Sequence, residues 1–218
     1  MKKGFTLFEI LVVLAITGTI VVLTIPNLSS NINKRTNAKL LESTSHSLGA
    51  ATKQIMMDER VTNLADTTMG TNVEIFISKY FKLTQYCGTT YTDCLASSYK
   101  SLDGENSVTT ETMLAGNTFY CGGTQSGTVI CLTNMTPDNG NTPGNSIAII
   151  DVNGKKFPNK NGDDLFSFNI YTDGKIGNQY NTTADDADGI TCRNYAGTAG
   201  YGGACYSKVV ADGWEINY

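Results

Sequence analysis

The sequence predicts an α+β protein in which one long N-terminal helix packs against an antiparallel sheet of about four strands. Three observations lead to this fold class. An apolar run opens the chain, a helical pattern continues behind it, and short β-prone runs separated by turn residues fill the C-terminal part. With 218 residues, the chain has the size expected of one long helix and one globular domain.

The first element is the apolar run from Phe5 to Ile25, in which Glu9 is the only charged residue. As a helix this run is about 31 Å long, which is enough to cross the core of a bilayer. A carboxylate in that core costs on the order of 2.5 kcal/mol or more, so Glu9 requires a partner.

The flanks of the apolar run indicate where the chain is processed. Residues 26–29 (PNLS) do not resemble the small-residue cleavage site of a secretory signal peptide, and no cysteine follows closely enough for a lipoprotein anchor. Cleavage before the run, between Gly4 and Phe5, is the remaining possibility. It would free an α-amino group about one helical turn from Glu9 and keep the apolar segment on the mature protein.

This N-terminal stretch closely resembles the class III signal sequence of type IV pilins and type II secretion pseudopilins. The matching residues are Lys2, Lys3, Gly4, Phe5, Thr6, Leu7, Glu9, the aliphatic run and Pro26. The resemblance implies that a prepilin peptidase cuts after Gly4 and methylates the new N-terminal residue, Phe5. It also implies that Glu9 meets the N-terminal amine of a neighbouring subunit in a filament, and that the chain has the type IV pilin fold.

Three segments are therefore expected: a leader peptide (1–4), an N-terminal stalk helix (5–58, with 5–25 transmembrane before assembly) and a disulfide-rich globular head (59–218). Behind Pro26, Leu41, Leu48 and Ile55 recur every seven residues and predict a helix face turned toward a core. Pro26 removes one backbone donor, so we expect a kink or local melting near residues 22–26.

The first element expected in the head is residues 72–83, whose apolar spacing favours a helix, although so short a run also fits a strand. Strands are expected at 112–120, 128–134, 146–152 and 165–171, with one face of the sheet on the stalk helix. Asp173-Gly174 between β-prone runs predicts a hairpin. Residues 151–176 also look similar to the heads of one pilin subgroup.

Six cysteines lie in the head: Cys87, Cys94, Cys121, Cys131, Cys192 and Cys205. An even number beyond the membrane segment indicates disulfides formed in an oxidising compartment. Six cysteines allow 15 pairings, so the sequence leaves the connectivity open. We expect sequential pairing, Cys87 with Cys94, Cys121 with Cys131 and Cys192 with Cys205. A zinc site is disfavoured because the chain has no C-x-x-C pair and only one histidine, His46.

No enzymatic activity is expected, because His46 lies on the stalk helix, far along the chain from the cysteine-rich head. The acidic pair Asp163-Asp164 is interpreted as a solvated turn, and residues 151–164 do not form an EF-hand loop because the glycine is misplaced. No cofactor is required. The acidic spacing of Asp185, Asp186 and Asp188 makes these residues candidate calcium ligands in a loop (178–203) expected on the outer filament surface or in head-to-head contact.

The resemblance implies a structural subunit of a type IV pilus-like surface filament, used for adhesion, motility, DNA uptake or secretion. The expected partners are copies of the same chain, other pilins, the prepilin peptidase, an inner-membrane assembly platform and, before assembly, the membrane. The expected location is the inner membrane as a single-pass precursor, then an extracellular pilus or a periplasmic pseudopilus. A net charge of −4 does not indicate a nucleic-acid surface. A type II secretion pseudopilin and a minor pilin acting as a binding or adhesion module remain alternatives.

Overall fold

The computed structural model describes residues 6–102, 104–136, 138, 144–177 and 203–218. The chain divides into two compact units, Met1–Thr36 and Asn37–Tyr218. Helix α1 (Leu7–Glu59) contributes to both of them. The local melting expected near Pro26 is absent, because α1 continues through this position without interruption. A proline removes one donor but leaves the hydrogen bonds of the neighbouring turns in place.

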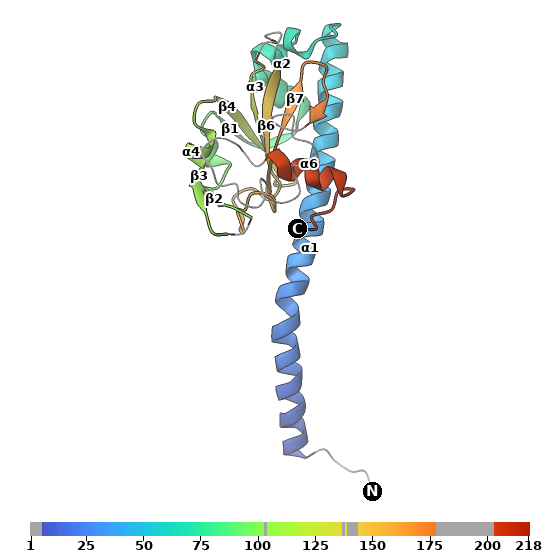
Figure 1. The fold of residues 1–218 in the computed structure, drawn as a ribbon, viewed down its shortest axis with the longest axis vertical. Coiled ribbons are helices and arrows are strands. Elements are labelled where there is room, and N and C mark those ends of the chain that lie inside the picture. Colours follow the sequence, from blue (N-terminus) through green and yellow to red (C-terminus); the bar gives the residue numbers. More distant parts are fainter. Residues whose placement is uncertain (1–5, 103, 137, 139–143, 178–202) are drawn as a thin grey trace. The chain divides into compact units, whose positions relative to one another are not determined.

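The second unit contains a six-stranded antiparallel sheet with the order β1-β4-β5-β6-β7-β8. Its strands are β1 (Leu83–Gly88), β4 (Phe119–Thr124), β5 (Val129–Thr133), β6 (Asn145–Asp151), β7 (Leu165–Tyr171) and β8 (Ile176–Gly177). Figure 1 shows several of these strands beside α1. The prediction of an α+β fold is confirmed, but the prediction of about four strands is wrong. The additional strands lie at the two edges of the sheet, where β1 has the mixed sequence LTQYCG and β8 has only two residues.

One face of the sheet packs on α1. The predicted stripe of Leu41, Leu48 and Ile55 is buried and shares a core with sheet residues such as Ile130 and Phe168. Side chains at this spacing fall on one side of a helix, so the stripe meets the flat face of the sheet. The prediction of a core-facing helix is confirmed.

The other face of the sheet is covered as well, which the sequence did not indicate. Leu95, Tyr99 and Leu114 pack with Cys131 and Ile149 in a second buried cluster. The covering segment contains the short helix η2 (Tyr91–Asp93), the two-stranded sheet of β2 (Ser98–Lys100) and β3 (Ser107–Thr109), and helix α4 (Thr110–Leu114). Successive residues of a strand point to opposite faces, so covering both faces buries every residue of β5.

Short helices connect α1 to the sheet: η1 (Leu64–Asp66), α2 (Thr68–Thr71) and α3 (Val73–Tyr80). The helical reading of residues 72–83 is thus confirmed for α3, whose N-cap residue Asn72 accepts the N–H of Ile75 at 3.3 Å. The strand predicted at 112–120 is wrong in its first part, because residues there form α4. The side chain of Thr109 accepts the N–H of Thr112 at 3.2 Å and caps that helix, a local preference that overrides β propensity.

The hairpin predicted at Asp173-Gly174 joins β7 to β8. Gly174 has φ +77°, which favours glycine, and a Cβ at this position would lie 2.7 Å from Met56 Cε of α1. The last described helix, α6 (Gly203–Ala211), and the C-terminal tail dock on the core through Val209 and Ile216.

Candidate functional site

Glu9 lies in the first turn of α1, where its carboxylate has a local partner. Glu9 Oε2 accepts hydrogen bonds from the backbone N–H and the hydroxyl of Thr6, both at 2.8 Å. In return, the N–H of Glu9 donates to Thr6 Oγ1 at 3.3 Å. This reciprocal pair is a capping box, with Thr6 as the N-cap residue. The sequence analysis missed the role of Thr6, although T-x-x-E before an apolar run is the signal of such a cap. The predicted cleavage residues Gly4 and Phe5 lie outside the described residues.

The apolar side chains that follow Glu9 are exposed. Every residue from 6 to 20 is exposed, including Leu7 at 81%, Leu14 at 62% and Ile20 at 54%. Because a helix turns by about 100° per residue, the consecutive apolar residues 10–14 cover all sides of it. An apolar surface of this kind requires lipid or protein to cover it. Within the part of the chain whose side chains are described, no helix carries an apolar stretch long enough for a membrane span.

The structure contains two of the predicted disulfides. Cys87 and Cys94 are bonded with a Cα–Cα distance of 6.0 Å, and Cys121 and Cys131 with one of 4.1 Å. The second bond joins directly opposite residues of β4 and β5. All four cysteines are buried in the second cluster. The first bond ties β1 to the covering segment, and the second ties two neighbouring strands of the sheet.

Other predicted site residues fall outside the described part of the chain. Cys192 does so, and its expected partner Cys205 is fully buried on α6. The loop 178–202, with the candidate calcium ligands Asp185, Asp186 and Asp188, is also outside it. Among the described residues, no group of three or more His, Cys, Asp or Glu side chains is arranged to hold a metal ion.

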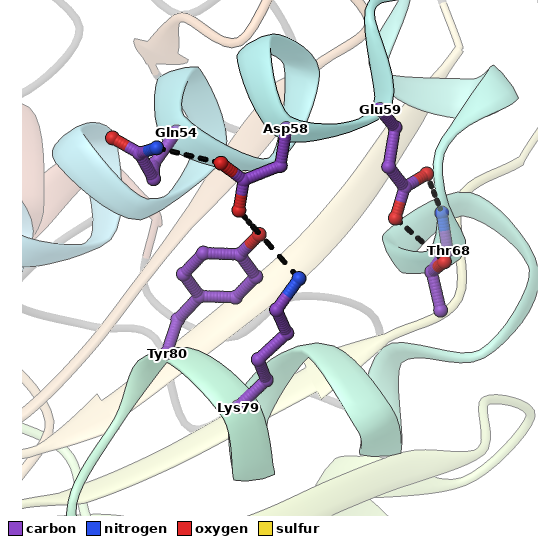
Figure 2. A network of polar contacts seen from close by, with 6 residues as sticks. All are labelled: Gln54, Asp58, Glu59, Thr68, Lys79 and Tyr80. Atoms are coloured by element: carbon purple, nitrogen blue, oxygen red, sulfur yellow. Dashed lines mark hydrogen bonds and ion pairs between the residues drawn. The ribbon is translucent and has the colours of Figure 1, made fainter.

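A polar network ties the end of α1 to the helices that follow (Figure 2). Asp58 accepts hydrogen bonds from the hydroxyl of Tyr80 at 2.6 Å and from Gln54 at 2.7 Å, and it lies 3.5 Å from the ammonium group of Lys79. The hydrogen bond from Tyr80, with help from Gln54, lowers the pKa of Asp58 below its ordinary value.

The residue next to Asp58 makes a second connection in the same region. The carboxylate of Glu59 accepts the N–H of Thr68 at 2.8 Å and its hydroxyl at 2.6 Å (Figure 2). Thr68 is the first residue of α2, so this carboxylate satisfies a free N–H at a helix start. Both contacts fix the turn by which the chain leaves α1.

A buried carboxyl pair was missed by the sequence analysis. Asp151 ends β6, Asp164 precedes β7, and both are fully buried. Asp151 accepts a hydrogen bond from the hydroxyl of buried Tyr99. Burial raises the pKa of Asp151 to about 8 and that of Asp164 to about 6, and it raises the pKa of Tyr99 as well.

The interpretation of Asp163-Asp164 as a solvated turn is therefore wrong for Asp164. Its carboxylate accepts the backbone N–H groups of Asn159 at 2.8 Å and Lys160 at 2.6 Å. A carboxylate that satisfies loop N–H groups organises the loop from inside, which exposure patterns in the sequence do not reveal.

His46 contacts an aromatic side chain of the C-terminal tail. Its ring and that of Trp214 meet edge to face with centroids 5.5 Å apart, and Tyr206 meets the same tryptophan at 6.1 Å. These contacts help hold the tail against α1 within the second unit.

The chain matches no protein-family model, no curated protein and no solved structure.

Proposed function

We propose that this chain is a structural subunit of a type IV pilus-like surface filament, polymerised through the apolar N-terminal part of α1. The observation that supports this proposal is the exposure of apolar side chains on all sides of α1 between Leu7 and Ile20, next to a single carboxylate, Glu9. A helix of this kind is unfavourable in water until lipid or other protein covers it. In this proposal, the bilayer covers it first, and the same helices of other copies cover it in the filament.

In this proposal, Glu9 makes the transfer of the helix from the bilayer to the filament specific. Lipid tails are as apolar as leucine, so moving the helix from lipid to a bundle of helices gains little hydrophobic free energy. Packing and polar pairing must then drive assembly. A carboxylate in an apolar environment gains strongly from an opposite charge, and cleavage after Gly4 would create that charge at the N-terminus of each copy.

The second unit fits a role outside the cytoplasm. Its buried disulfides, Cys87–Cys94 and Cys121–Cys131, persist in oxidising compartments. In this proposal the precursor sits in the inner membrane, where a prepilin peptidase cleaves and methylates it. An assembly platform then moves it into a filament with its head on the outside.

The maturation of the chain tests this function. Replacement of Gly4 by glutamate is expected to leave the precursor uncleaved and absent from filaments, because it removes the residue before the cut. Lys2→Gln changes the leader without touching the cut and serves as the control. Mass spectrometry of filaments sheared from cells expressing wild type or Lys2→Gln should find chains that start at methylated Phe5.

Two results would contradict the proposal. One is a mature chain that starts after Pro26, which would make the apolar run a removed signal peptide. The other is processed protein that never enters a filament in either the sheared surface fraction or the periplasm. Filaments in the periplasm alone would assign the chain to a secretion pseudopilus.

A further inference from the structure

The loop between β6 and β7 encloses two carboxylates without a counter-charge. Asp151 and Asp164, at its two ends, are both 0% exposed. Within the described part of the chain, neither of them forms an ion pair with a lysine, arginine or histidine. Lys155 and Lys156 belong to the same loop but are exposed. Burying a carboxyl group favours its neutral form unless a positive charge accompanies it.

Asn153 connects the two carboxylates. Its backbone N–H donates to Asp151 Oδ1 at 3.1 Å, and its Nδ2 donates to Asp164 Oδ2 at 3.3 Å. The backbone N–H of Asn159 reaches the same oxygen of Asp164 at 2.8 Å. These contacts link both carboxyl groups to Asn153 and place the backbone of Asn159 beside Asp164.

Two amide oxygens of this loop lack hydrogen bonds. The side-chain Oδ1 atoms of Asn153 and Asn159 are buried and have no hydrogen-bond partner, and Asn159 as a whole is only 8% exposed. The oxygen and nitrogen of an amide are about 2 Å apart, so the oxygen of Asn153 also lies beside Asp164. A half-turn of that amide would exchange the two atoms and turn its oxygen toward the carboxylate. Buried acceptors without donors are rare in folded proteins and call for an explanation.

We propose that this loop binds a calcium ion through the carboxylates of Asp151 and Asp164 and the side-chain oxygens of Asn153 and Asn159. Carboxylate and amide oxygens are the ligands that calcium prefers, and its flexible coordination suits an irregular loop better than the strict octahedron of magnesium. One cation would favour the ionised form of both carboxyl groups and satisfy both amide oxygens. This site differs from the predicted one at Asp185, Asp186 and Asp188, and it does not depend on the proposed filament function.

Calcium at this position would act on two packing contacts of the loop. The side-chain Nδ2 of Asn37 on α1 donates to the carbonyl oxygen of Asp163 at 2.9 Å. The hydroxyl of Tyr218 donates to the carbonyl oxygen of Gly162, also at 2.9 Å. A cation that fixes the loop therefore also fixes its contacts with α1 and with the C-terminus. Calcium is expected to stabilise the second unit as a whole.

The test uses the full chain in detergent micelles after removal of metals with a chelator. Calcium chloride is added while binding is followed by calorimetry and thermal unfolding by the fluorescence of Trp214. Asn159→Gly removes one proposed ligand and keeps the backbone at φ 51°, which glycine adopts readily. Asp173→Asn changes an exposed carboxylate on the β7–β8 hairpin and serves as the matched control.

Wild type and Asp173→Asn are expected to bind calcium and to unfold at a higher temperature with it, with magnesium acting more weakly. Asn159→Gly should keep the metal-free unfolding temperature and weaken calcium binding roughly tenfold. If the wild type does not bind calcium even at about 10 mM, a concentration above the dissociation constants of extracellular calcium sites, the proposal is overturned. It is also overturned if binding survives in Asn159→Gly but is lost when Asp185, Asp186 and Asp188 are replaced by asparagine.

Discussion

At the scale of single residues, Glu9 illustrates how one side chain can serve a helix and an assembly. Within the chain its carboxylate accepts two hydrogen bonds from Thr6 and closes a capping box at the start of α1. Such a cap stabilises the start of the helix by less than it costs to leave a carboxylate in an apolar environment. The cap therefore orients Glu9 but leaves a substantial gain for an opposite charge from another copy.

Two substitutions separate the cap from the proposed contact between subunits. Glu9→Leu is expected to leave membrane insertion intact, or improve it, and to reduce filament yield strongly, because the carboxylate that recruits a neighbour's amine is lost. Thr6→Val removes only the capping hydroxyl and should cost about 1 kcal/mol at the helix start while filaments still form. Yields are compared by shearing filaments from cells that express only one variant. Wild-type yield from Glu9→Leu would argue against the contact.

At the scale of secondary-structure elements, the contacts at the end of α1 decide where the chain turns. Asp58 and Glu59 close the helix by bonding to Tyr80 on α3 and to Thr68 on α2. Because the folded state lowers the pKa of Asp58, this carboxyl stabilises the fold at pH values above its unfolded pKa. The contribution is lost as the pH falls through the lower folded pKa.

Tyr80→Phe tests this connection. Because the hydroxyl of Tyr80 is the main cause of the lowered pKa, its removal should raise the pKa of Asp58 toward the ordinary value of 3.8. Lys79→Gln removes a weaker contribution and should move the pKa less. Carboxyl NMR shifts of Asp58 across an acid titration provide the measurement. An equal or larger shift in Lys79→Gln would mean that charge, rather than the hydrogen bond, controls this site.

In the β4–β5 hairpin, a disulfide and the packing of the core both contribute to the free energy of unfolding. Its disulfide between Cys121 and Cys131 is 1% and 0% exposed and faces the second core. The Cys87–Cys94 bond closes a loop of similar length that starts on the edge strand β1. The chain-entropy model assigns each bond roughly 2–3 kcal/mol. The two disulfides should therefore differ in how much core packing is lost when each is removed.

Replacing Cys121 and Cys131 together by alanine is expected to lower the free energy of unfolding by roughly 3 kcal/mol or more, since it opens both the loop and the core. The matched double variant at Cys87 and Cys94 should cost less, because these residues lie nearer the surface at 6% and 4% exposure. Urea unfolding followed by the fluorescence of Trp214 compares them. Equal losses would mean that loop closure alone accounts for both bonds.

At the scale of the whole molecule, the two units place opposite demands on their surroundings. In the first unit, described side chains from 6 to 20 expose apolar surface and require a partner. In the second unit, apolar residues are buried on both faces of the sheet and the polar network of Figure 2 lies at its surface. A chain with both properties is suited to the proposed role, in which the helix is held by other copies and the folded unit stays in water.

The sequence by itself determined the features that depend on neighbours along the chain. The helical period of α1 placed Leu41, Leu48 and Ile55 toward the core, and a β-prone run between turn residues predicted the bounds of β7. Two disulfides followed from short spacing, because nearby cysteines meet with little loss of chain entropy.

Only the tertiary structure decided the features that depend on contacts across the chain. Strand β1 exists because β4 offers it hydrogen-bond partners, and its own residues, LTQYCG, carry no clear pattern. The segment that covers the second face of the sheet buries residues of β5 that would otherwise face solvent. Asp151 and Asp164 lie in a stretch rich in glycine, asparagine and lysine that reads as a solvated loop, yet folding seals both carboxylates inside it. Burial is a property of what the rest of the chain places around a residue, and local composition does not contain it.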